Sequence, residues 1–154
     1  MKHPKSYDSS PETRKRMSKV KLKNGRAEQV LAKQLWRLGY RYRKNYKHLP
    51  GSPDIAITKY NIAIFVDGEF WHGKDWEIRK SRLKNNREYW IEKIEENMAR
   101  DKRVDEQLRA IGWSPIHFWS KDVIKNTDSC ISDIISFIVE NDYSNDVVEI
   151  NIEE

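Results

Sequence analysis

The segment 62–73, IAIFVDGEFWHG, brings together residue types that bind cations and move protons. Its apolar run ends in Asp67, and His72 follows five residues later. A carboxylate can bind a hard cation such as magnesium, which takes oxygen ligands at ~2.1 Å. A histidine can take a proton from water or assist a leaving oxygen. The segment therefore predicts a site at which a metal ion and a histidine act together.

A second acid, Asp54, follows Pro53 at the start of another apolar run. If the two runs are adjacent strands, Asp54 and Asp67 both lie at strand ends. We expect Asp54 to bind magnesium, with the backbone carbonyl of Val66 or the side chain of Asp67 as a second ligand. Metal-bound water is a stronger acid, and a bound cation offsets charge on a phosphate. The alternative for each acid taken singly is a surface salt bridge, whereas the acids taken together favour a site.

Further acids interrupt the apolar faces of predicted helices. Asp101 and Asp105 both fall within the apolar stripe of a long helix at 100° per residue, so periodicity does not choose between them. A carboxylate on a buried face is costly unless it is paired, hydrogen-bonded or bound to metal. Glu28 lies one turn before Leu31, at the edge of the buried face of the first helix. The stripe of the long helix consists of Trp90, Ile94, Met98 and Leu108.

Two adjacent aromatic residues, Phe70 and Trp71, lie between the acids and His72. Such pairs are most often divided between core and surface. Aromatic side chains can also insert between base steps of a duplex and unstack them, at a cost of a few kcal/mol. Because Phe70 and Trp71 follow the Asp67-Gly68 turn, we expect them to project from the sheet edge.

Hydrophobic periodicity predicts an α/β fold, with a small mixed central sheet flanked by helices. Helices are predicted over residues 25–38, 86–111 and 128–141, the first two ending at Gly39 and Gly112. Strands are predicted over residues 40–45, 54–58, 61–67 and 114–120, the middle two forming a hairpin. Residues 68–84 are predicted to be irregular.

Charge is distributed unevenly along the chain, whose net charge is +5. Residues 1–50 contain 15 Lys/Arg and 3 Asp/Glu, whereas residues 141–154 contain 5 acids and no Lys/Arg. Concentrated basic charge favours a polyanion partner, although it is also typical of a solvated tail. We predict a basic arm over 1–23, a single domain over 24–141 and an acidic tail over 142–154.

The remaining composition excludes several classes of protein. The length of 154 residues suits one domain that buries a core without disulfides. A single cysteine, Cys130, excludes an intramolecular disulfide and a zinc site built from several cysteines. The first residues contain no apolar signal-peptide region, and no stretch is long enough to span a membrane. We therefore expect a soluble cytoplasmic protein, without membrane contact and monomeric.

The chain resembles the very short patch repair (Vsr) endonucleases, whose fold is related to the type II restriction-endonuclease fold. Four segments carry the resemblance, and together they extend over about residues 14 to 120. They are RMSKVKLKNGRAE (16–28), LPGSPDIAI (49–57), IFVDGEFWHG (64–73) and YWIEKIEENMARDKRVDEQLRAIGW (89–113).

The resemblance implies a role for each matching residue. Asp54 corresponds to the central metal ligand and His72 to the catalytic histidine. Asp101 corresponds to the acid that supports the histidine or the metal-bound water, which favours it over Asp105, and Glu28 to a supporting carboxylate. The resemblance further implies that Met17, Phe70 and Trp71 intercalate beside the mismatched base pair. We also expect basic residues of the arm and first helix to contact the DNA, namely Lys19, Lys21, Lys23 and Arg26.

The chain departs from the family pattern at two places. The best-known members hold a structural zinc with cysteines and a histidine, where this chain has Glu69, Trp76 and Ser120. We therefore expect no structural zinc. Asp67 stands where those members have a histidine, which affects the expected metal ligation.

The resemblance implies a Mg²⁺-dependent endonuclease that nicks or cleaves double-stranded DNA at a mismatch, with a DNA methylase or repair proteins as possible partners. Two alternatives remain at this stage. One is a restriction-type or homing endonuclease of the same fold acting on matched DNA. The other is a catalytically silent DNA-binding module, against which the complete set of Asp54, His72 and Asp101 argues.

Overall fold

The computed structural model describes residues 25–152, and the side chains of residues 25–142. The predictions for Met17, Lys19, Lys21 and Lys23 lie outside the described residues. A first helix covers residues 25–37. The elements after it are β1 (Arg43–Lys44), β2 (Ile55–Ile57), β3 (Ile62–Asp67), α2 (Trp76–Arg82), α3 (Arg87–Ala110), β4 (Ser114–Trp119), α4 (Ser120–Lys125) and α5 (Thr127–Ile152). Within the described residues, no helix is both long and apolar enough to cross a membrane.

The strands form one mixed sheet in the order β1-β2-β3-β4. The predicted hairpin is confirmed, because β2 and β3 pair antiparallel with Ile55 opposite Ile64. Strand β4 pairs parallel to β3, with Phe65 opposite His117. A parallel pair needs a long crossover connection, and α2 and α3 supply it. The α/β prediction, a small mixed sheet flanked by helices, is confirmed.

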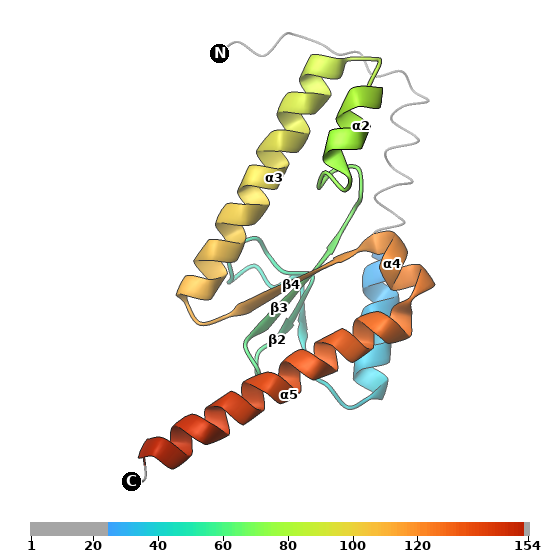
Figure 1. The fold of residues 1–154 in the computed structure, drawn as a ribbon. Coiled ribbons are helices and arrows are strands. Elements are labelled where there is room, and N and C mark those ends of the chain that lie inside the picture. The colour runs from blue at the N-terminus through green and yellow to red at the C-terminus, as the bar shows by residue number, and fades with distance from the viewer. Residues whose placement is uncertain (1–24, 153–154) are drawn as a thin grey trace.

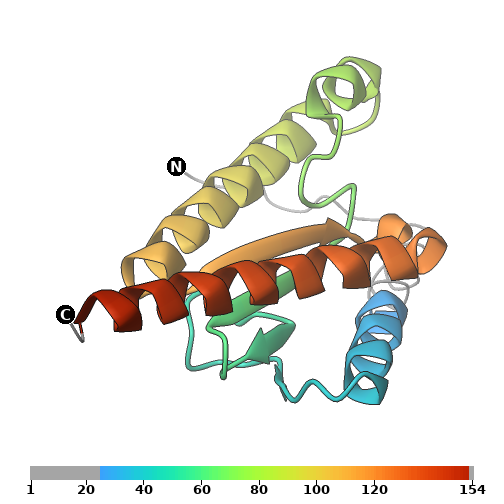
Figure 2. The same cartoon turned by 60° about the horizontal axis from the view of Figure 1, so that its bottom comes forward.

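Helices cover the two faces of the sheet differently, as Figures 1 and 2 show. The first helix, α4 and α5 lie on one face, and α3 lies on the other. Because side chains alternate along a strand, Ile62, Ile64 and Val66 enter the larger core beneath α5. Ala63 and Phe65 instead belong to a smaller cluster with Leu108 of α3. The same alternation places Asp67 on the α3 face, where its charge can meet polar side chains of that helix.

The end of α3 fixes the start of β4. Gly112 has φ 84°, in the left-handed region that glycine adopts most readily. This conformation lets the backbone N–H of Trp113 donate to the carbonyl of Leu108 at 2.9 Å, a pattern that terminates many helices. The chain then enters β4 directly, which brings β4 beside α3.

Several sequence-based element predictions were wrong in extent. Residues 68–84 contain α2, and α4 was not predicted. The strand predicted over 40–45 has only two residues, and α5 continues past residue 141 to Ile152. Leu38, the last residue of the predicted first helix, is 49% exposed because the helix ends before it.

Tertiary contacts explain why α2 escaped prediction. Its sequence, WEIRKSR, has no apolar stripe, and Ile78 is exposed. The helix is instead held against α3 by Glu95, which accepts hydrogen bonds from the Trp76 indole at 3.2 Å and from the Lys80 ammonium at 2.8 Å. Pairing of this kind depends on two segments that are distant in sequence.

Candidate active site

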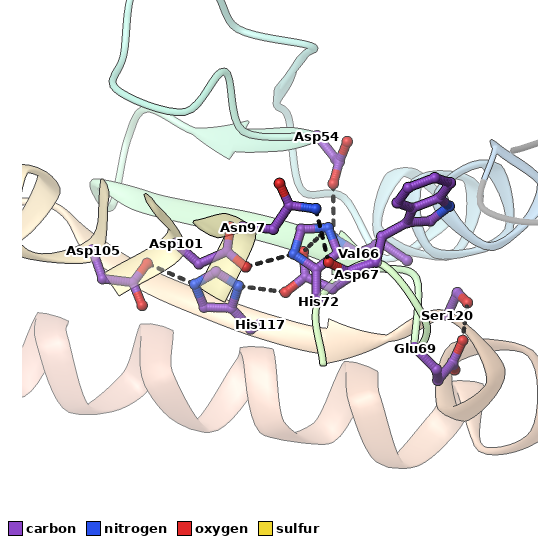
Figure 3. Close-up of polar contacts among 11 residues, drawn as sticks. Asp54, Val66, Asp67, Glu69, His72, Asn97, Asp101, Asp105, His117 and Ser120 are labelled. Atoms are coloured by element: carbon purple, nitrogen blue, oxygen red, sulfur yellow. Dashed lines mark hydrogen bonds and ion pairs between the residues drawn. The ribbon is translucent and has the colours of Figure 1, made fainter. Parts of the chain in front are cut away.

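Carboxylates and two histidines line a pocket between the sheet and α3 (Figure 3). The side chains come from the loop before β2, the end of β3, the loop after it, α3 and β4. The pocket is lined by Gly51, Ser52, Asp54, Phe65, Val66, Asp67, His72, Arg100, Asp101, Val104 and His117. Four of the predicted site side chains, those of Asp54, Asp67, His72 and Asp101, thus lie around one cavity.

Asp54 is held at the open end of the hairpin by the strand beside it. Its Oδ2 accepts a hydrogen bond from the backbone N–H of Val66 at 2.7 Å. The N–H and C=O of one strand residue point to the same side of the strand. The Val66 carbonyl therefore faces the edge where Asp54 lies, just before the first residue of β2. A carboxylate oxygen and a carbonyl oxygen side by side are ligands that magnesium accepts.

Glu28 of the first helix lies against Asp54. Burial, then the charge of Asp54 and a hydrogen bond with it, raise the pKa of Glu28 to about 8. Burial also raises the pKa of Asp54, although the hydrogen bond from Val66 opposes this rise. Two carboxylates this close cannot both ionise at low cost unless a cation offsets their charge. The donor set therefore fits a divalent cation.

His72 is fixed by α3. Its Nδ1 lies 2.5 Å from Oδ2 of Asp101, and its Nε2 lies 3.8 Å from Oδ1 of Asp67. Burial alone would lower the pKa of His72, but the Asp101 hydrogen bond and the charge of Asp67 outweigh it, and the pKa is raised. A histidine held through Nδ1 by a carboxylate presents Nε2 for proton transfer.

The loop that carries His72 is braced from several directions. The backbone N–H of His72 donates to the carbonyl of Gly68 at 3.1 Å, which closes a turn. The amide of Asn97 on α3 donates to the Trp71 carbonyl at 3.1 Å. Gly73 has φ 72°, in the left-handed region that glycine adopts most readily, and a Cβ there would meet the side chain of Met98. Glycine therefore favours this close approach of the loop to α3.

Sequence analysis did not select His117, although it lies in the pocket. Its Nδ1 is 2.7 Å from Oδ2 of Asp67, and its Nε2 is 2.6 Å from Oδ1 of Asp105. Burial would lower its pKa, but the hydrogen bonds and charges of the two aspartates raise the pKa to about 9. The alternation in β4 indicates only the face of the sheet, because His117 lies between apolar Ile116 and Phe118 and so faces the opposite side.

Asp101 and Asp105, between which periodicity could not choose, both face the pocket region. Each binds one histidine, Asp101 binding His72 and Asp105 binding His117. Residues four apart on a helix share a face, so one turn of α3 supplies both carboxylates.

The aromatic pair packs in part against α3. Phe70 and Trp71 are half-buried, and their rings meet Trp90 edge-on at centroid distances of 5.2 and 5.6 Å. Tyr89 adds a further edge-on ring contact with Trp90, at 5.1 Å. An aromatic cluster of Phe70, Trp71, Tyr89 and Trp90 thus forms beside the pocket. One further predicted DNA contact, Arg26, lies among the described residues. Its side chain is exposed on the first helix.

Glu69 and Ser120, two of the residues noted as departing from the family pattern, bond to each other. The buried Glu69 carboxylate accepts from the Ser120 hydroxyl at 2.9 Å and from the Lys121 backbone N–H at 2.7 Å. Burial would raise the pKa of Glu69, but these hydrogen bonds lower it below its usual value. The His72 loop is therefore tied to the start of α4 by charge-assisted hydrogen bonds.

The raised pKa of Glu28 predicts a pH-dependent stability of the metal-free protein. A carboxyl whose pKa rises from 4.5 to about 8 on folding holds its proton more tightly in the native state. Its contribution to stability is present at low pH and is lost as the pH rises from 4.5 toward 8. For a half-exposed group we expect a loss on the order of 1 kcal/mol after solvent screening, or about 2–4 °C in Tm.

Thermal melts in chelator at pH 5.5 and pH 8, compared with Glu28→Gln, measure this effect. The variant should show a smaller fall in Tm between the two pH values, since it removes the titrating group. Magnesium should raise the wild-type Tm more at pH 8, because metal ligands must be deprotonated. Equal pH slopes for wild type and variant would show that Glu28 does not titrate in this range.

Comparison with known proteins gives the family to which this chain belongs. The family model described as DNA mismatch endonuclease Vsr matches residues 6–78. The Type II nicking enzyme V.NmeDIP of Neisseria meningitidis serogroup C is 53% identical over 122 residues, covering 79% of this chain and 82% of that protein. V.HpaIIP, a Type II nicking enzyme of Haemophilus parainfluenzae, is 50% identical over 133 residues, or 85% and 94% of the two chains. The DNA mismatch endonuclease Vsr of Escherichia coli K12 is 32% identical over 105 residues, covering 68% and 67%.

Because these relatives are nicking enzymes and a mismatch endonuclease, this α/β domain is an endonuclease. The chain belongs to the Vsr family, as its resemblance in four segments implied.

Proposed function

We propose that this endonuclease uses magnesium to nick one strand of duplex DNA at a mismatched base pair. One observation carries the proposal: His72, held by Asp101 at 2.5 Å, lines the same pocket as Asp54. The pocket thus offers a proton-transfer group beside a candidate cation site. The names of the relatives as nicking enzymes and as a mismatch endonuclease support the choice of substrate.

Magnesium would be held by the Asp54 carboxylate and the Val66 carbonyl, with Asp67 as a further candidate ligand. When bound, the cation would offset charge on the scissile phosphate and acidify water. Among the described residues no group of three or more His, Cys, Asp or Glu side chains is arranged to hold a metal ion. Magnesium keeps several waters and usually takes one or two protein carboxylates plus substrate phosphate, so the proposal needs no such group.

The protein groups divide the proton chemistry between them. His72 takes a proton from water or assists the leaving oxygen through Nε2. Asp101 keeps the ring oriented through Nδ1 and stabilises the imidazolium that forms. Glu28 shares negative charge with Asp54 and tunes its affinity for the cation. We further propose a restriction-endonuclease-like fold, a monomer, no structural zinc, and a DNA methylase or repair proteins as possible partners.

Mismatch preference would come from aromatic side chains that unstack bases. Trp71 directly precedes His72, which lines the pocket, and Phe70 and Trp71 are only half-buried, so a duplex lying over the pocket would meet them. Unstacking costs least at a base that is already mispaired. Met17 and the basic residues of the arm would contact the same duplex, with the arm supplying salt-dependent affinity.

Trp71→Ala should weaken binding to a mismatched duplex more than to a matched one. Base–aromatic stacking is worth roughly 1–3 kcal/mol per base, so affinity for the mismatched duplex should fall about 5- to 150-fold. Titrations of paired duplexes that differ by one base pair, at fixed salt, measure both affinities. Trp90→Ala is the control, because it opens the same aromatic cluster from α3. Equal losses on both duplexes, or the same pattern in the control, would assign Trp71 to packing or general contact.

Action on matched DNA remains a second candidate, favoured by the name Type II nicking enzyme carried by several relatives. The same duplex pair decides between the two functions. Equal nicking of both duplexes at one sequence would select the restriction-type function.

A further inference from the structure

His117 lies between two carboxylates that belong to different elements. Its Nδ1 lies 2.7 Å from Oδ2 of Asp67, at the end of β3. Its Nε2 lies 2.6 Å from Oδ1 of Asp105, on α3. Figure 3 shows the chain of contacts running from Asp105 through His117 to Asp67. Both ring nitrogens are thus engaged within the protein.

The ring of His117 is also fixed on its flat side. It stacks on Phe65 with centroids 4.8 Å apart and an interplanar angle of 11°. The two residues lie opposite each other in the parallel pairing of β3 and β4. Rotation of the ring would therefore break the stack and both hydrogen bonds together.

This arrangement determines how Asp67 is oriented. Its Oδ2 is taken by His117, while its Oδ1 lies 3.8 Å from Nε2 of His72. The side chain is only 11% exposed, so little water competes for it. Without His117, Asp67 would be a nearly buried carboxylate in a pocket that it shares with Asp54 and Asp101.

We propose that His117 is a positioning residue for the nuclease reaction, which braces Asp67 so that its free oxygen faces the metal site and His72. Asp105, on α3, holds the other ring nitrogen of His117, Nε2. Carboxylates that bind a metal are themselves commonly held by such hydrogen bonds, and loss of the supporting group typically costs 10- to 100-fold in metal affinity or activity. The inference rests on the proposed function, since it gives Asp67 a part in binding the cation.

Three substitutions of His117 separate the effect of its contact with Asp67 from that of its contact with Asp105. The side-chain amide of asparagine reaches about as far as Nδ1 and can donate to Asp67, whereas that of glutamine reaches about as far as Nε2 and can donate to Asp105. Alanine removes both donors. All three variants lose the stack on Phe65, so differences among them report the hydrogen bonds alone. Melting curves of each variant confirm that it is folded before it is compared.

Magnesium affinity, measured by calorimetric titration without DNA, is the first readout. We expect His117→Ala to weaken it by roughly 10- to 100-fold, and His117→Asn to restore most of the loss while His117→Gln does not. Single-turnover nicking should follow the same order in rate, with DNA affinity unchanged. Asp105→Asn should have a smaller effect, because an amide oxygen still accepts from Nε2.

Several results would overturn the positioning role. Restoration by glutamine but not asparagine would show that His117 only ties β4 to α3. Unchanged magnesium affinity in His117→Ala would show that His117 does not act on the metal through Asp67. A loss of nicking rate with unchanged magnesium affinity would place the His117 ring in the reaction itself. Failure of the wild type to nick any duplex would instead count against the proposed function, since the affinity order is measured without DNA.

Discussion

Asp54→Asn is expected to abolish DNA cleavage. Asp54 is the carboxylate that faces both the Val66 backbone and Glu28, so its loss removes the main candidate ligand for the cation. Charge stabilisation by a metal ion is worth several kcal/mol, and each 1.36 kcal/mol is a factor of ten. The cleavage rate should therefore fall by about 10³-fold or more. DNA affinity in chelator should persist or rise, because a negative charge near phosphate is removed.

Cleavage kinetics over a range of magnesium concentrations measure this loss, with DNA binding in chelator as the companion assay. Asp133→Asn is a matched control, since Asp133 is exposed on α5 and does not line the pocket. It should cleave at the wild-type rate. Wild-type cleavage by Asp54→Asn would remove this residue from the mechanism.

The second large effect is expected for His72→Ala. Because His72 lines the pocket and is oriented by Asp101, loss of the ring should lower the cleavage rate by roughly 10²- to 10⁴-fold, the usual range for a general acid or base. DNA affinity and magnesium affinity should change little. A single-turnover assay with saturating enzyme isolates the chemical step.

His48→Ala is the control for this substitution, because His48 is exposed and does not line the pocket. Asp101→Asn should cost less than His72→Ala, since an amide can still hold the ring through a weaker hydrogen bond. A full-rate His72→Ala enzyme would exclude this histidine from proton transfer. A parallel fall in Tm and rate would assign the loss to the His72 loop, not to the reaction.

The elements with strong local signals were predictable from the sequence. The apolar runs on either side of Lys59 and Tyr60 predicted the hairpin of β2 and β3, and the apolar stripe followed by Gly112 predicted α3 within a residue at each end. In both cases the spacing of apolar residues along the local sequence identifies the buried face. The α2 helix has no such period, and its contacts with α3 are made through the buried Trp76 and through hydrogen bonds to Glu95.

The site was predictable only where a residue interrupts a local pattern. Asp54, Asp67 and Asp101 each break an apolar run or stripe, and all three line the pocket. The contact of Glu28 with Asp54 joins a helix to a strand end, and no periodicity encodes that distance. His117 alternates with apolar neighbours as a surface residue would, so its place between Asp67 and Asp105 follows from the parallel pairing of β4 with β3.

The most direct test of the central claim is strand cleavage in a pair of end-labelled duplex pools. One pool carries a single mismatched base pair within randomised flanking sequence, and the other is fully matched. Each is incubated with the protein in magnesium or in chelator and resolved under denaturing conditions. The proposed mechanism predicts a nick in one strand of the mismatched pool, in magnesium only. Intact strands in both pools with magnesium present, or equal cleavage in chelator, would contradict it.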